Sequence, residues 1–166
     1  MLILGIDPGS INCGYGIIET EVGKITLAGC NTIKTKSKNI LSKRLLVIYD
    51  ELINIITLYK PDVAAIESMF YGKNIQSAFT LGHARGVCLL ALAANKIDFF
   101  EYSPREIKKS ITGNGNSTKE QIQYMIRNIF PTKGIKQASF DATDALAVAY
   151  CHYNKIRFLQ KLKQGE

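Results

Sequence analysis

The sequence predicts a single α/β domain built on a mixed β-sheet, and three observations carry that prediction. A continuous apolar run from Leu2 to Ile6 stops abruptly at the turn sequence 7–9, as a buried strand does. Two β-rich segments follow, at 15–20 and 25–33, and the break between them indicates a hairpin. Later strand-like runs are separated by segments of helical periodicity, an arrangement typical of parallel strands joined by helices.

The later strands are predicted at 63–67, a buried run that ends on Glu67, and at 97–102. A basic connection, 34–44, precedes the first helical pattern. Apolar residues at helical spacing, together with capping residues and prolines, mark the helices. These helices are predicted at about 45–60, 76–95, 104–109, 118–129 and 140–158.

The chain of 166 residues has the length of one domain, which we assign to residues 1–158, followed by a polar C-terminal tail at 159–166. The longest apolar runs are too short to cross a bilayer, and the N-terminal segment lacks the basic region of a signal peptide. We therefore expect a cytoplasmic protein with no membrane partner. The 4 cysteines are scattered and form no CxxC pair, so a zinc site is not expected.

Positive charge is in excess along the chain. The sequence has 21 Lys and Arg against 14 Asp and Glu, which gives a net charge of +7. Such an excess favours a polyanionic partner, chiefly nucleic acid, although a basic surface without a partner would give the same count. Charge alone therefore supports a role with DNA without establishing it.

Carboxylates occur in apolar surroundings at four positions, where an unpaired charge is costly to bury: Asp7, Glu67, Asp141 and Asp144. Asp7 and Glu67 each end a buried strand, at the edge where open α/β sheets usually place their sites. Asp141 and Asp144 share one face at the start of the last helix. Each acid alone has an ordinary explanation, as a turn residue, a surface acid or an acid stabilised by the helix dipole. Their convergence on one edge is what predicts a site.

Converging carboxylates repel one another unless a cation lies among them. Oxygen-only ligands suit Mg²⁺ or Mn²⁺. Two such ions, about 3.5–4 Å apart, can activate a water and stabilise the leaving oxygen in phosphodiester hydrolysis. We therefore expect two Mg²⁺ ions per subunit, with Mn²⁺ able to substitute, and no protein nucleophile.

Blocks of sequence along nearly the whole chain carry a more specific signal. They are the strand-turn-strand at 4–18, the segments 65–74 and 81–87, Glu101-Tyr102, the segment 108–119 and the motif 141–147. In order and spacing these blocks resemble the bacterial RuvC Holliday-junction resolvases. The resemblance implies an RNase H-like fold, with a five-stranded mixed sheet and helices on both faces.

The resemblance also implies a function. Asp7, Glu67, Asp141 and Asp144 would be the catalytic and metal-binding acids of a magnesium-dependent endonuclease. Its substrate would be the four-way (Holliday) DNA junction, resolved by paired symmetric nicks that leave 5′-phosphates during recombination and repair. A homodimer through the helix around 76–95 is implied, and so are the branch-migration proteins RuvA and RuvB as partners.

Four further residues match family positions that contact DNA. The resemblance implies that the aromatic pair Phe70 and Tyr71 stacks on unpaired bases near the crossover, and we expect only one of the two to reach DNA. Lys108 and Lys119 match basic residues near the scissile phosphate. The alternative for each lysine is an ordinary solvated position on a helix.

Other functions remain open at this point. A sugar-kinase or actin-like ATPase also begins with an apolar strand and a Gly-Ile-Asp turn, but that fold needs two lobes and 166 residues supply one. An RNase H-like nuclease acting on another branched DNA or RNA substrate is a second alternative. A non-catalytic junction-binding protein is a third, and the presence of all four carboxylates argues against it.

Overall fold

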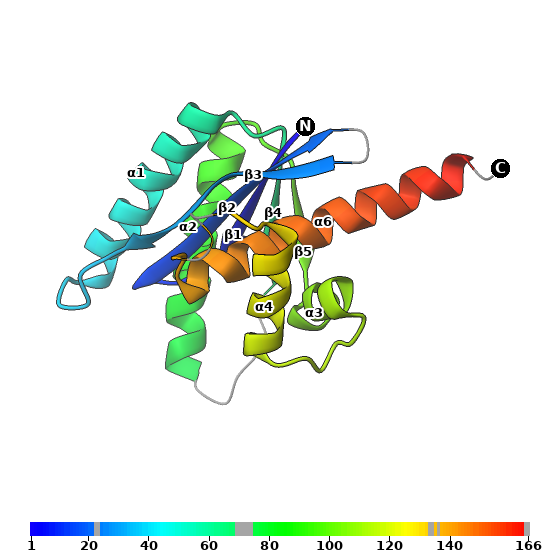
Figure 1. Cartoon of the computed structure of the whole chain (residues 1–166). Helices are drawn as coiled ribbons and strands as arrows, with labels where there is room; N and C mark the ends of the chain where they lie inside the picture. The colour runs from blue at the N-terminus through cyan, green and yellow to red at the C-terminus, as the bar shows by residue number, and fades with distance from the viewer. Residues whose placement is uncertain (22–23, 69–74, 133–134, 136, 165–166) are drawn as a thin grey trace.

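The computed structural model describes residues 1–21, 24–68, 75–132, 135 and 137–164. Within these residues the strands form a five-stranded sheet in the order β3-β2-β1-β4-β5 (Figure 1). The pairs β1–β2 and β2–β3 are antiparallel, whereas β1–β4 and β4–β5 are parallel, so the predicted mixed sheet is confirmed. The strands are β1 (Leu2–Asp7), β2 (Asn12–Glu21), β3 (Lys24–Lys34), β4 (Val63–Glu67) and β5 (Phe99–Tyr102).

Helices cover both faces of the sheet (Figure 1). On one face α1 (Leu41–Tyr59) and α2 (Ile75–Ala94) enclose an apolar core with strand residues such as Leu4 and Ile6. On the other face a second core, which includes Ile3, is closed by three helices. These are α3 (Pro104–Thr112), α4 (Lys119–Ile129) and α6 (Phe140–Gln164). The alternation of β1 side chains between the two cores follows from the two-residue period of a strand.

The helix α6 lies directly on the first two strands because glycines there leave room for its backbone. A Cβ atom at Gly5 would collide with the carbonyl oxygen of Ala145, and one at Gly14 with the carbonyl oxygen of Asp141. At Gly16 an added Cβ would lie 2.6 Å from the side chain of Leu146. The glycines therefore fix how closely the start of α6 approaches the sheet.

Element boundaries differ from the sequence-based prediction mainly at helix ends. Helix α3 continues to Thr112, and α6 continues six residues past the predicted end at 158, to Gln164. Residues 159–164 are Leu, Gln and Lys, which are all good helix formers, so nothing in the sequence stops the helix earlier. The segment predicted as a polar tail is thus helical to Gln164 and exposes Leu159 and Leu162 as well as polar residues. The division at residue 158 stays a prediction.

Candidate active site

Two of the four predicted acids stand at the ends of neighbouring strands. Strands β1 and β4 are parallel neighbours, and Ile6 is paired in register with Ile66. The next residue on each strand is an acid, Asp7 and Glu67 respectively. Because parallel strands end at the same edge, both carboxylates lie at the carboxyl edge of the sheet, where open α/β sheets place their ligands.

The other two acids are brought to this edge by the start of α6. Asp7 is paired with Gly14 of β2, and it is Gly14 against which the backbone of Asp141 packs. Ser139 fixes the beginning of the helix, since its Oγ accepts a hydrogen bond from the Ala142 amide at 3.2 Å and lies 2.5 Å from Oγ1 of Thr32 on β3. Asp144 follows one turn later on the same face of the helix. The close packing of α6 therefore places both acids near Asp7.

Burial and the proximity of the acids to one another raise the pKa values of three of them. Burial, reinforced by the negative charges of Glu67, Asp144 and Asp141, raises the pKa of Asp7 to about 8. Burial and then the charge of Asp144 raise the pKa of Glu67 as well. The pKa of Asp144 is raised by burial, with a smaller contribution from Asp141 and opposition from Lys119. The cluster therefore resists full ionisation unless a cation compensates it.

A lysine, Lys119, lies in contact with this cluster of acids. The Nζ atom of Lys119 lies 2.6 Å from Oδ2 of Asp144. Lys119 stands at the first position of α4 because Thr118 forms a capping box with Gln121. Burial lowers the pKa of the ammonium group, but the hydrogen bond and charge of Asp144, with the charges of the other acids, outweigh this and leave the pKa raised.

Three of the four acids, Asp7, Glu67 and Asp144, line two adjoining cavities of about 200 Å³ and 210 Å³, which together we call the acidic cleft. Asp141 is not among the residues that line them, although its charge acts on Asp7. Glu67 and Pro104 border both cavities. The first is also lined by Asp7, Pro8, Ser68, Leu81 and Arg85. The second is also lined by Ile107, Lys108, Lys119, Ile122, Asp144 and Ala147. Both lysines predicted to approach the scissile phosphate thus border the acidic cleft.

Arg85 was not predicted as a site residue; the sequence placed it only within the expected dimer helix. Arg85 borders the first cavity, and its Nη2 lies 2.7 Å from Oε1 of Glu101. Its Nε is buried without a hydrogen-bond partner among the described residues. Three elements, β4, β5 and α2, must pack together to create this environment. No local sequence signal reports such a long-range arrangement.

The donor chemistry of the acidic cleft fits a hard divalent cation, because all four acids offer carboxylate oxygens and repel one another. Among the described residues, no three His, Cys, Asp or Glu side chains stand close enough to enclose one ion. The predicted DNA contacts Phe70 and Tyr71 lie outside the described residues.

A mixed five-stranded sheet, covered by helices on both faces and carrying acids at its carboxyl edge, defines the class of RNase H-like nucleases. The chain belongs to one family within this class. The family model described as crossover junction endodeoxyribonuclease RuvC matches residues 3–152. The family consists of metal-dependent nucleases.

Individual relatives agree along almost the full length. The chain is 45% identical to the crossover junction endodeoxyribonuclease RuvC of Dehalococcoides mccartyi, over 100% of this chain and 99% of that protein. With the same enzyme of Ruminiclostridium cellulolyticum it shares 44% identity, over 95% and 94% of the two chains.

Solved structures show the same similarity in three dimensions. A structure of Thermus thermophilus RuvC in complex with Holliday junction substrate matches with a TM-score of 0.86 and 27% identity, covering 95% of this chain and 96% of that one. A yeast mitochondrial Holliday junction resolvase matches in fold alone, with a TM-score of 0.68 and 14% identity over 99% of this chain and 86% of that one. The predicted RNase H-like fold is thereby confirmed.

Proposed function

We propose that this protein resolves four-way DNA junctions by paired symmetric nicks, one from each subunit of a homodimer, leaving 5′-phosphates. The observation that carries the proposal is the acidic cleft. Four carboxylates from β1, β4 and α6 meet at one edge of the sheet, in a chain that belongs to the RuvC family. The nicks would then be ligatable products of recombination and repair.

Divalent ions supply the chemistry that carboxylates alone lack, namely activation of a water and stabilisation of the leaving oxygen. We propose two Mg²⁺ ions per subunit, for which Mn²⁺ can substitute, held by Asp7, Glu67, Asp141 and Asp144. Lys119 and Lys108 border the same cleft and offer positive charge to the scissile phosphate. Ile107 and Ile122 give the cleft an apolar wall, which strengthens these electrostatic interactions by excluding water.

The homodimer is proposed to form through α2. This helix is apolar and long enough to cross a membrane by length and composition, but Ala84, Cys88, Ala91 and Leu92 are buried in the core. Its other face exposes Phe79 by 67% and Leu90 by 59%. On that face no atom of the described residues lies within 4 Å of a Cβ atom added at Gly86, so a partner helix can approach closely there.

Further partners rest on the family alone. RuvA and RuvB, the branch-migration proteins, would deliver the junction to this enzyme in the cytoplasm. One of Phe70 and Tyr71 would stack on an unpaired base at the crossover. In the sequence, both residues belong to the segment between β4 and α2, which are two of the elements that border the acidic cleft.

The decisive experiment compares three substrates of equal length: a mobile four-way junction, a linear duplex and an RNA–DNA hybrid, each with and without Mg²⁺. We expect metal-dependent, paired cutting of the junction and little cutting of the other two. Equal cutting of all three would contradict junction selectivity, and preferential cutting of the hybrid would favour the alternative RNase H-like activity. Junction binding without cutting in any metal would favour a non-catalytic binding protein.

The dimer is tested separately by Leu90→Glu, which puts a charge in the centre of the exposed face of α2. We expect wild-type protein to sediment as a dimer and this variant as a monomer. Leu58→Glu is the matched control, because Leu58 is 74% exposed on α1 and is not part of that face. Dimerisation that survives Leu90→Glu would contradict the proposed interface.

A further inference from the structure

A second charged surface lies on the same edge of the sheet as the acidic cleft. Four exposed lysines occupy the end of β3, the connection into α1 and the first turn of α1: Lys34, Lys36, Lys38 and Lys43. We call them the basic edge strip. No acid occurs in the sequence between Glu21 and Asp50, so no neighbour in the chain offsets their charge. In the described part of the chain the ion pairs are Arg85–Glu101 and Lys119–Asp144, and neither involves the strip.

The register of the sheet fixes where the strip lies. Lys34 at the end of β3 is paired with Asn12 at the start of β2, and Gly14 of β2 is paired with Asp7. The strip therefore begins at the edge where Asp7 ends β1, two strand spacings away. With about 4.8 Å between strands, the separation across the sheet is roughly 10 Å. In Figure 1 the turn between β3 and α1 projects beyond the sheet on this side.

Hydrogen bonds from Thr35 and Arg44, which are neighbours of the strip lysines in the sequence, hold this segment against the loop that follows Asp7. Nη1 of Arg44 donates to Oγ of Ser10 at 3.0 Å. The Oγ1 of Thr35 donates to the carbonyl oxygen of Ser10 at 2.8 Å, and the Thr35 amide donates to the carbonyl oxygen of Ile11, also at 2.8 Å. The lysine-bearing connection is therefore held at a defined position relative to the acidic cleft.

One lysine of the strip, Lys43, carries its positive charge where it does not favour the stability of α1. Lys43 lies in the first turn of α1, which contains no acid, and Ile40 at its N-cap offers no side-chain hydrogen bond. Helix N-termini favour negative charge, and α3 and α4 follow that rule with Glu106 and Glu120. Positive charge at this position is therefore better explained by an external anion than by folding.

We propose that the basic edge strip binds the phosphate backbone of one junction arm as that arm leaves the acidic cleft past β2 and β3. This inference rests on the proposed function and adds a second, non-catalytic contact surface to it. A row of exposed lysines suits DNA phosphates because it binds them as point charges, with no dependence on base sequence. At 3.4 Å per nucleotide along one strand, 10 Å places the first contacts roughly three nucleotides from the cut.

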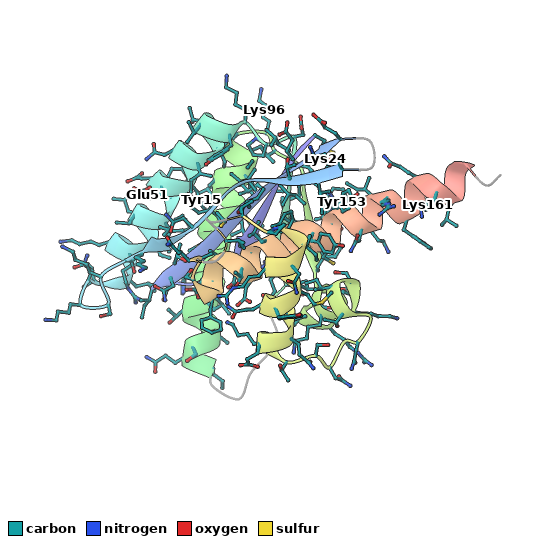
Figure 2. The ribbon with its side chains drawn as sticks, viewed as in Figure 1. Tyr15, Lys24, Glu51, Lys96, Tyr153 and Lys161 are labelled. Atoms are coloured by element: carbon teal, nitrogen blue, oxygen red, sulfur yellow. The ribbon has the colours of Figure 1, made fainter. Side chains whose placement is uncertain are left out.

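The test compares a variant that lacks three positive charges of the strip with a variant that lacks three positive charges elsewhere. The strip variant is Lys36→Gln/Lys38→Gln/Lys43→Gln. The matched control is Lys24→Gln/Lys96→Gln/Lys161→Gln, which has the same net charge. Figure 2 shows these control residues on the sheet end opposite the strip and on the projecting part of α6, and all are exposed.

Junction binding is measured without divalent ions across a range of salt concentrations. We expect the slope of log K against log salt to become shallower by about 2 to 3 in the strip variant and to stay near the wild-type value in the control, because each phosphate contact contributes about 0.9. At 0.1 M salt the strip variant should bind at least about 10-fold more weakly. With Mg²⁺ and saturating enzyme, both variants should cut within about twofold of the wild-type rate, because no strip residue borders the cleft.

The position of the proposed phosphate contacts is tested with a junction that has neutral methylphosphonate linkages three to five nucleotides from the cut. It should weaken wild-type binding and leave the strip variant unaffected. Equal slopes for wild type and strip variant, or equal losses in strip variant and control, would overturn the inference. Wild-type protein that neither binds nor cuts junctions would instead remove the proposed function on which the inference rests.

Discussion

The acidic cleft and the basic edge strip lie on one edge of one sheet, yet they are opposite in almost every physical respect. Asp7 is mostly buried among other acids, and its pKa is raised to about 8 by burial and by their charges. The four lysines of the strip are exposed and free of ion pairs within the described residues. Buried charges interact strongly and depend on precise packing, whereas exposed charges act weakly and additively and are screened by salt. We therefore expect the cleft to control the rate of cutting, and the strip to control the affinity of the protein for DNA.

The largest expected effect comes from Asp7→Asn. This change keeps the size of the side chain but removes a carboxylate that we propose as a ligand of the divalent ions. Losing about 4 kcal/mol of transition-state stabilisation would slow junction cutting by roughly 1000-fold. Binding should stay within about twofold of wild type, since the strip is intact. Single-turnover cleavage and metal-free binding, measured on the same junction, check both halves; a variant that nicks at a normal rate would show that Asp7 is not in the site.

Gly14→Ala tests how far the cleft depends on packing. The added Cβ would collide with the carbonyl oxygen of Asp141, so α6 must move away from β2. Overpacking of this kind costs about 1–3 kcal/mol, which lowers the melting temperature by several degrees in a protein of this size. The same displacement should reduce the cutting rate by moving Asp141 and Asp144. Thermal unfolding followed by circular dichroism is the measurement.

The strip variant Lys36→Gln/Lys38→Gln/Lys43→Gln provides the contrast in the same unfolding assay. Its melting temperature should change by no more than about 2 °C, since surface substitutions usually stay within about 0.5 kcal/mol. If Gly14→Ala were as harmless as the strip variant, the cleft would not depend on the close contact between α6 and the sheet.

A smaller effect, on the pH dependence of stability, is expected from His152, which lies outside both regions. His152 is 2% exposed, its Nδ1 lies 2.7 Å from the hydroxyl of Tyr102, and burial lowers its pKa. As the pH falls below the ordinary value of about 6.5, the unfolded chain takes up the proton before the folded protein does, so stability is lost on acidification. His152→Asn should therefore lose less stability than wild type between pH 7.5 and 5.5.

Tyr102→Phe is the companion variant for this measurement. It keeps His152 titrating but removes the hydroxyl partner, so it should be less stable by about 1 kcal/mol at neutral pH and retain the acid sensitivity. Urea unfolding at several pH values distinguishes the reduced acid sensitivity expected of His152→Asn from the unchanged acid sensitivity expected of Tyr102→Phe. Identical acid profiles for wild type and His152→Asn would assign the sensitivity to other groups.

The smallest effect is expected from Ser10→Ala, which removes a side-chain acceptor of Arg44 between the two regions. Arg44 keeps only the 3.5 Å contact with the Ser10 carbonyl oxygen, so we expect a loss of about 1 kcal/mol or less in stability. Cutting at saturating enzyme should fall no more than about threefold. A loss approaching that of Asp7→Asn would show that the strip and the cleft cannot be treated as separate.

The sequence was sufficient for the features that each depend on a few neighbouring residues. Asp7 and Glu67 stand at strand ends, and Asp141 and Asp144 are related by one helical turn, so their approach to one edge followed from local patterns and topology. Arg85 was not identified as a cleft residue, because its place between Glu101 and the cavity results from three elements packing together. The contact of Lys119 with Asp144 likewise depends on how α4 meets α6, which no spacing encodes. The base-stacking role of Phe70 and Tyr71 stays a prediction.

The helix α6 begins at the acidic cleft and ends in an arm that projects from the body of the protein (Figure 1). Its contacts with Gly5, Gly14 and Gly16 lie within the first ten residues. Beyond residue 152, where the match to the family model ends, 12 more residues to Gln164 extend about 18 Å at 1.5 Å per residue. The glycine contacts include Asp141 itself and lie on both sides of Asp144, so they hold the same stretch of helix that carries the two acids. A purification tag added at the C-terminus would therefore be attached at the end of α6 that lies away from the two predicted acids.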